Sequence, residues 1–268
     1  MSGRLAGKVA VVAGAGASSD GVIGNGQATA LLFAREGAKV VCVDAVEERA
    51  RATADMIAAE GGVASVCRAD VSKAADCDAM VRAAVERHGG LEILDNNVGI
   101  SVRSDVLEVT EEQWDCVMAV NVKSIVLASK YAIPQMKKRG GGSIINISSV
   151  AGLRANQSTP YTTSKAAIIG LTRSMAGDHG RDGIRVNCIL PGLIYGPMTA
   201  PRMDEEIRRQ RREAGALGTE GTGWDVAHAA LFLASDESRW ITGVALPVDA
   251  GLLVMSPVTH ARLAQQKF

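Results

Sequence analysis

Short runs rich in β-branched residues alternate with longer segments of helical period along nearly all of the 268-residue chain. Strands are expected at 8–13, 39–43, 63–69, 91–94, 143–148, 184–189 and 244–248, and helices at 26–36, 46–60, 73–87, 111–138, 161–179 and 224–234. Right-handed helical crossovers between parallel strands bury both faces of such a sheet. We therefore predict an α/β fold: one doubly wound domain over residues 1–268, with a parallel sheet of about seven strands.

Two segments depart from this alternation. Residues 193–222 contain the polar sequence DEEIRRQRREAG, and we expect a flexible helical flap there that covers a site at the carboxyl ends of the strands. The tail at 252–268 is apolar first and polar later, and whether it crosses to a neighbouring subunit stays open. The arginines of the flap form either a solvated face or a surface that attracts an anionic substrate: Arg208, Arg209, Arg211 and Arg212.

Charge and cysteine content exclude several classes of function. Basic and acidic residues both number 29, so no excess charge favours nucleic acid or an anionic membrane. Five cysteines without a CxxC pair predict reduced core residues in a cytoplasmic protein, and we expect neither a signal segment nor a membrane-spanning run. No metal site is predicted, because the four histidines lack ligand spacing: His88, His179, His228 and His260.

The first expected strand runs into a glycine-rich loop, AGAGASSDGVIGNGQATA. Gly14 lets the chain turn off the strand, while Gly24 and Gly26 let backbone approach a pyrophosphate at the start of the following helix. Gly16 and Ile23 of the same loop are further candidates. Glycines alone are equally compatible with a generic strand-to-helix turn. Their place between the first strand and the first helix favours a dinucleotide-binding domain of Rossmann type.

Asp44 ends the second expected strand, eighteen residues after Gly26. A carboxylate at this point can accept both ribose hydroxyls of an adenosine. It would repel a 2′-phosphate by about 4 kcal/mol at 4 Å and an effective dielectric constant near 20. NAD is therefore predicted over NADP. The alternative is that Asp44 only caps the next helix.

Further motifs resemble those of the short-chain dehydrogenase/reductase family over nearly the whole chain. The resemblance implies that Asp70 and Val71 contact adenine, and that Asn97 and Gly99, from the sequence NNVG, line the cofactor site. It implies a nicotinamide-side turn at Pro191, Gly192 and Ile194. The implied catalytic residues are Asn121 of VNVKS, Ser149 after the fifth strand, and Tyr161 and Lys165 of YTTSK.

Tyr161 and Lys165 lie four residues apart on a helix, so they share a face. Lowering the pKa of tyrosine from about 10 to about 7 requires roughly 4 kcal/mol, which a nearby ammonium can supply. In the implied mechanism Tyr161 is the general acid/base and Lys165 also binds the nicotinamide ribose. Ser149 holds the substrate oxygen, and Asn121 holds a water that relays protons from Lys165.

Four departures from the family pattern affect these assignments. About six extra residues around 18–22 leave open which amides meet the pyrophosphate, and Val98 replaces a smaller residue beside the cofactor. The loop before Tyr161 is one residue short, so Ser148 competes with Ser149, which we prefer as the second serine of the pair. Gly196 stands where many members carry a threonine that bonds the nicotinamide carboxamide.

The sequence therefore predicts an NAD-dependent oxidoreductase that moves a hydride between nicotinamide and a secondary alcohol or ketone. Two alternatives remain: an NADPH-dependent carbonyl or 3-oxoacyl reductase, and an inactive nucleotide-binding regulator. A homo-oligomer, tetramer or dimer, is expected through the helices that carry Asn121 and Tyr161. Candidate substrate-pocket residues point to a moderately polar small molecule: Ser101, Arg103, Arg154, Asn156, Leu193, Tyr195, Met198 and Met203.

Overall fold

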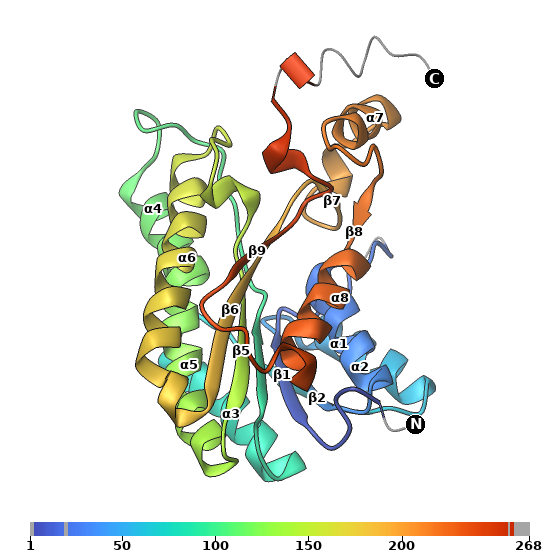
Figure 1. Ribbon diagram of the computed structural model, residues 1–268, viewed down its shortest axis with the longest axis vertical. Helices are drawn as coiled ribbons and strands as arrows, with labels where there is room; N and C mark the ends of the chain where they lie inside the picture. Colours follow the sequence, from blue (N-terminus) through green and yellow to red (C-terminus); the bar gives the residue numbers. More distant parts are fainter. Residues whose placement is uncertain (1–2, 19–20, 257, 260–268) are drawn as a thin grey trace.

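A seven-stranded parallel sheet forms the centre of the computed structural model, which describes residues 3–18, 21–256 and 258–259 (Figure 1). Its strands are β1 (Val9–Ala13), β2 (Lys39–Asp44), β3 (Val63–Arg68), β4 (Ile93–Asn96), β5 (Gly142–Ile147), β6 (Ile184–Pro191) and β9 (Ala245–Val248). Their order in the sheet is β3-β2-β1-β4-β5-β6-β9, and each neighbouring pair is parallel. The predicted doubly wound α/β fold is confirmed.

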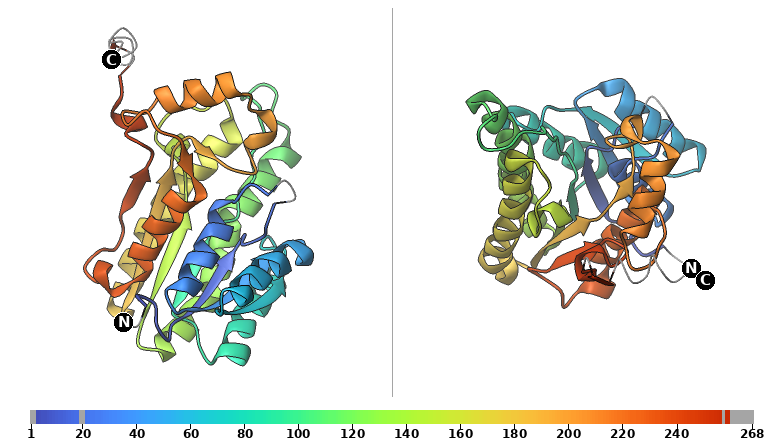
Figure 2. Two further views of the ribbon diagram at one scale, coloured as in Figure 1. Left: turned by 90° about the vertical axis from the view of Figure 1, so that its right-hand side faces the viewer. Right: turned by 90° about the horizontal axis from the view of Figure 1, so that it is seen from above.

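Helices cover both faces of this sheet, as the view from above makes clear (Figure 2). Three helices pack on one face: α1 (Asn25–Arg35), α2 (Glu47–Ala59) and α8 (Gly223–Ala234). Another three pack on the opposite face: α3 (Ala74–His88), α5 (Ser124–Lys138) and α6 (Thr159–His179). A shorter helix, α4 (Glu111–Met118), precedes α5 and packs against α6.

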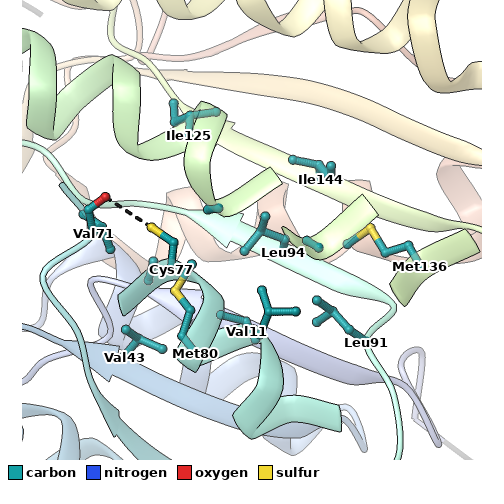
Figure 3. Close-up of a cluster of buried hydrophobic side chains, with 14 of the residues drawn as sticks. Val11, Val43, Val71, Cys77, Met80, Leu91, Leu94, Ile125, Met136 and Ile144 are labelled. Carbon is teal, nitrogen blue, oxygen red and sulfur yellow. Dashed lines mark hydrogen bonds between the residues drawn. The ribbon is translucent and has the colours of Figure 1, made fainter. Parts of the chain in front are cut away.

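The core consists of two apolar clusters, one on each side of the sheet. Successive residues of β1 point to opposite faces, so Val11 enters one cluster and Val12 the other. In the cluster drawn in Figure 3, strand residues such as Leu94 meet Met80 of α3 and Ile125 of α5. Burial on both faces explains the near-continuous apolar strands in the sequence.

The helix expected at 111–138 is interrupted by a π-helical turn, Ala119–Lys123, between α4 and α5. The sequence analysis treated this region as one regular helix. It also expected no run long enough to span a membrane, whereas Glu111–Lys138 is long and apolar enough by length and composition. In the structure this run is a core helix, since Ile125, Ala128 and Met136 are buried in the cluster shared with α3 and the sheet.

The flap region contains more order than the sequence indicated. β7 (Ile194–Tyr195) pairs with β8 (Gly221–Thr222), and α7 (Glu205–Glu213) lies between them in the chain. In Figure 1, α7 lies at the same end of the molecule as the first turn of α6. Of the tail, Leu252–Val254 forms one 3-10 turn, whereas residues 257 and 260–268, including His260, lie outside the described residues.

The expectation of five buried cysteines is correct for three. Cys42, Cys77 and Cys188 are buried, but Cys67 is half-buried on β3 and Cys116 is exposed on α4. The error at Cys116 arises because α4 buries only Val117, so an apolar neighbourhood in sequence does not become a core position. All five thiols are free.

Candidate active site

A cleft of about 800 Å³ opens at the carboxyl ends of the strands. It is bordered by the glycine loop, the segments after β4 and β5, the first turns of α6, and the flap. Twelve of the residues singled out in the sequence line it: Gly14, Gly16, Gly24, Gly26, Asn97, Gly99, Ser149, Tyr161, Lys165, Pro191, Gly192 and Ile194.

The glycine loop is folded tightly against the start of α1. Gly14 has a positive φ of 84°, which favours glycine. A Cβ at Gly26 would lie 2.2 Å from the Gly14 carbonyl oxygen and 2.4 Å from Nδ2 of Asn97, so only glycine fits. Gly24, the N-cap of α1, provides no side-chain cap, and the first amides of the helix are left for an anion.

Ile23 does not line the cleft. It packs, partly buried, against the apolar cluster of α1 and α8, and its contact with the cofactor stays a prediction.

The two carboxylate oxygens of Asp44, which does not line the cleft, have different neighbours. Its Oδ1 accepts a hydrogen bond of 2.9 Å from the amide of Val46, the N-cap residue of α2. Its Oδ2 faces the glycine loop, since a Cβ at Gly16 would lie 2.2 Å from that oxygen. The same Cβ would lie 2.9 Å from Cβ of Arg49, a basic residue that the sequence analysis did not consider.

Asp70 and Val71 lie beside the cleft but do not line it. The Asp70 carboxylate accepts hydrogen bonds from the hydroxyl (2.7 Å) and amide (3.1 Å) of Ser72, and it pairs with Lys73 at 3.3 Å. The bonds from Ser72, helped by Lys73, lower the pKa of Asp70. Val71 lines a separate small hollow beside Val98. In the structure Asp70 therefore organises the turn before α3.

The two serines after β5 have different partners. Ser148 is buried, and its hydroxyl donates to the backbone oxygen of Lys165 at 2.7 Å. Ser149 accepts a 3.1 Å bond from the amide of Ala151, and its hydroxyl is near enough to Tyr161 to act on the pKa of that phenol. The geometry favours Ser149 as the residue that meets a substrate oxygen.

Lys165 is 4% exposed and donates from Nζ to the carbonyl of Ile147 at 2.8 Å. The Nζ atom lies 5.6 Å from the centre of the Tyr161 ring. Burial lowers the pKa of Lys165 to about 8. Burial also raises the pKa of Tyr161, against a smaller opposing effect of the Ser149 hydroxyl. The pKa of Tyr161 is therefore raised in this structure, and its lowering by Lys165 stays a prediction.

Asn121 ties the segment after β4 to α6. Its Oδ1 accepts from the amide of Ile100 at 2.8 Å, while its Nδ2 donates to the Ile100 carbonyl (3.0 Å) and the Ser164 hydroxyl (2.9 Å). A Cβ at Gly99 would lie 3.2 Å from Nζ of Lys165 and 3.7 Å from Oδ1 of Asn121. Asn121 thus holds the segment at Ile100 against α6, and its side chain lies near Lys165.

The flap side of the cleft begins at Gly192, where a Cβ would lie 2.6 Å from Cα of Asp249. Gly196, which lacks the threonine of the family pattern, is followed by Thr199, whose hydroxyl donates to the Ile194 carbonyl at 3.1 Å. Thr199 lines the cleft and was missed, because it stands three residues after the expected position.

Six of the eight predicted substrate-pocket residues line the cleft: Ser101, Arg103, Arg154, Asn156, Leu193 and Met198. Tyr195 and Met203 do not. Tyr195 lies in β7, and its ring stacks under the guanidinium of Arg208 at 4.2 Å. Arg202, Arg211 and Leu252 line the cleft and were not in the predicted pocket.

The comparisons with known proteins agree on a family. The family model described as enoyl-(acyl carrier protein) reductase matches residues 16–253. The 2,5-dichloro-2,5-cyclohexadiene-1,4-diol dehydrogenase of Sphingobium indicum is 42% identical over 252 residues, which are 94% of this chain and 98% of the relative. The chain is a short-chain dehydrogenase/reductase. Its relatives include proteins named as dehydrogenases and as reductases, which supports an oxidoreductase that acts on small molecules.

Solved structures of this short-chain dehydrogenase/reductase family share the whole fold. One from Burkholderia xenovorans has a TM-score of 0.89 and 38% identity, and covers 95% of this chain and 99% of its own. A 7α-hydroxysteroid dehydrogenase in complex with NADH and 7-oxo glycochenodeoxycholic acid has a TM-score of 0.87 and 34% identity. The match covers 92% of this chain and 95% of that structure. Among the described residues of this chain, no group of three or more His, Cys, Asp or Glu side chains could hold a metal ion.

Proposed function

We propose that the protein is an NAD-dependent oxidoreductase that interconverts a secondary alcohol and a ketone. The observation that carries the proposal is the grouping of Ser149, Tyr161 and Lys165 in the wall of one cleft that also contains the glycine loop. Ser149 and Tyr161 are near enough for the serine to act on the pKa of the phenol, so their two hydroxyls can hold one substrate oxygen.

The cleft fits a nicotinamide dinucleotide. The uncapped start of α1 offers amides to the pyrophosphate, and Gly26 leaves the space that a Cβ would fill. Oδ2 of Asp44 would hold the adenosine ribose, and Gly192 would border the nicotinamide. When bound, the nicotinamide supplies the hydride donor or acceptor.

In the proposed reaction Tyr161 moves the proton of the substrate oxygen. During alcohol oxidation its oxygen takes the hydroxyl proton, and during ketone reduction it returns a proton to the developing alkoxide. Ser149 donates to that same oxygen, so its contact strengthens as negative charge grows. Lys165, buried and fixed on the Ile147 carbonyl, stabilises the phenolate and is available to the nicotinamide ribose.

Selectivity for NAD rests on Asp44, whose Oδ2 faces the loop that would carry the ribose. Arg49 beside the same turn supports a second candidate, an NADPH-dependent carbonyl or 3-oxoacyl reductase. Its guanidinium could bind a 2′-phosphate by donating hydrogen bonds to it. The inactive regulator is the least favoured alternative, since the catalytic side chains are all present.

Reduced-nicotinamide absorbance tests the proposal, with a panel of secondary alcohols, diols and ketones run in parallel with the two cofactors. Turnover with NAD and little with NADP is the expected result. A preference for NADP would support the second candidate, and cofactor binding without turnover on any substrate would support the regulator.

A homo-oligomer, tetramer or dimer, and a cytoplasmic location remain predictions. The oligomer is proposed through the outer faces of α5 and α6, where Val126 of α5 is 46% exposed. Light scattering of the purified protein measures the subunit number.

A further inference from the structure

The lining of the cleft is basic. Four arginines line it, whereas none of its lining residues among the described part of the chain is an aspartate or a glutamate. These arginines are Arg103, Arg154, Arg202 and Arg211. A concave surface with charges of one sign concentrates ligands of the opposite charge.

The arginines come from segments that the structure fixes around the candidate catalytic residues. Arg103 precedes Ser104, whose carbonyl accepts a 2.9 Å bond from the amide of Thr159 in the first turn of α6. That turn also carries Tyr161. Arg154 follows Ser149 by five residues, and its Nη1 donates to the Leu252 carbonyl at 3.2 Å.

The flap contributes the other two. Arg202 ends a short 3-10 turn, Ala200–Arg202, and Arg211 lies on α7. Nη2 of Arg211 donates to the carbonyl of Ile194, close to Pro191 and Gly192 in the chain. The flap thus adds two arginines to the lining of the cleft.

Other arginines of α7 are neutralised, which makes Arg211 distinct. Arg208 donates to Glu220 at 3.0 Å, Arg209 pairs with Glu206 and Glu213 at 2.7 Å, and Arg212 pairs with Glu205 at 2.7 Å. Those pairs lie outside the cleft lining. Within the described residues no salt bridge involves Arg103, Arg154, Arg202 or Arg211, although Glu220 is near enough to Arg211 to stabilise its charge. The charges of the other three are the most available to a ligand.

We infer that the substrate of this enzyme carries an anionic group, a carboxylate, sulfonate or phosphate, and that the arginines of the cleft bind it while Tyr161 and Ser149 hold the reacting oxygen. The inference rests on the proposed function and specifies its substrate class. Guanidinium groups bind such anions through paired N–H donors, which orients the ligand as well as attracting it. Met198, an exposed apolar residue of the cleft lining, suits the carbon chain between the two ends.

The test uses methyl ketones that carry a terminal carboxylate, each paired with its terminal amide, over several chain lengths. A terminal sulfonate and a phosphate ester of one length distinguish the kinds of anion. We expect the carboxylate to have a kcat/KM at least about tenfold above that of the amide, the size of one charge-assisted hydrogen bond. The advantage should shrink as salt is added.

Variants assign the effect to residues. Arg103→Gln and Arg202→Gln should each lower the carboxylate-to-amide ratio of kcat/KM about tenfold through KM, and Arg202→Lys should restore part of it. Arg209→Gln, on α7 but outside the cleft lining, is the matched control and should leave the ratio unchanged. If the variants instead raise the KM for the nicotinamide, the arginines bind the cofactor and the inference is wrong.

The two failures can be told apart. Turnover of ketones without any preference for the anion would leave the proposed reaction intact and overturn the inference. If no ketone is reduced with either nicotinamide, the proposed function fails first. Calorimetric titration of the carboxylate and the amide into the enzyme with NADH then decides the inference, because equal binding of the pair would overturn it.

Discussion

The hydroxyl of Ser148 donates a hydrogen bond to the backbone oxygen of Lys165, 2.7 Å away. This contact connects the end of β5 to the helix that carries both Tyr161 and Lys165. Its neighbour Ser149 instead lies in the cleft lining, near enough to Tyr161 to act on the pKa of that side chain. We therefore expect the two adjacent serines to have separate functions, one that fixes the helix and one that contacts the substrate.

Replacing each serine by alanine should separate these functions. Ser149→Ala removes a donor to the substrate oxygen, and kcat should fall by about 10²- to 10³-fold. Ser148→Ala should cost about 1 kcal/mol of stability for the lost bond to the Lys165 carbonyl and reduce kcat much less. Steady-state kinetics and urea unfolding of both variants measure the two effects. The opposite ranking of kcat would reassign the substrate contact to Ser148.

Tyr161→Phe should abolish turnover and leave NAD affinity within a few-fold. The ring and its packing remain, whereas the proton carrier is lost, so we expect a fall of at least about 10²- to 10⁴-fold in kcat. Tyr131→Phe, a half-buried tyrosine of α5 outside the cleft, is the control. A Tyr161→Phe enzyme that keeps most of its activity would refute the acid/base assignment.

Asp44→Ala should shift the cofactor preference toward NADP. Removing the carboxylate removes its repulsion of a 2′-phosphate, and we expect the NADP-to-NAD ratio of kcat/KM to rise about tenfold or more. Because Arg49 lies beside the same turn, Arg49→Ala in the Asp44→Ala background should lower that ratio again. An unchanged ratio in both variants would mean that the ribose is recognised elsewhere.

Much of the fold could be predicted because alternating apolar runs determine which segments become strands. Most strand bounds agree within two residues, for example Lys39–Asp44 against the expected 39–43. The π-helical turn at Asn121 could not be predicted, since its extra residue changes neither composition nor hydrophobic period. Its cause is tertiary: both polar atoms of the Asn121 amide bond the backbone of Ile100.

Side-chain direction limited the prediction of the site. Arg209 and Arg211 lie two residues apart on α7, yet only Arg211 lines the cleft. A nine-residue polar helix without buried residues has no apolar stripe to indicate its inner face. Tyr195 of β7 was predicted to line the pocket, whereas its ring stacks with Arg208 of α7.

Asp95 is a fully buried carboxyl group in the centre of the sheet, on β4. Among the described residues neither of its oxygens accepts a hydrogen bond of acceptable distance and angle. The Thr29 hydroxyl is near enough to favour the charged form of Asp95 slightly. Burial is the larger effect and raises the pKa of Asp95 to about 8. At neutral pH the folded protein therefore keeps this group protonated.

This raised pKa should make the protein less stable as pH rises. Below about pH 4 the Asp95 carboxyl is protonated in both the folded and the unfolded state. Between about pH 4 and 8 only the unfolded chain releases this proton. The free energy of unfolding therefore falls by up to about 1.4 kcal/mol for each pH unit in this range. Asp95→Asn should remove that slope, whereas Asp78→Asn on the surface of α3 should keep it. Urea unfolding at fixed protein concentration across this range measures both variants. An unchanged slope in Asp95→Asn would show that Asp95 is ionised in the fold, with a partner that stabilises its charge.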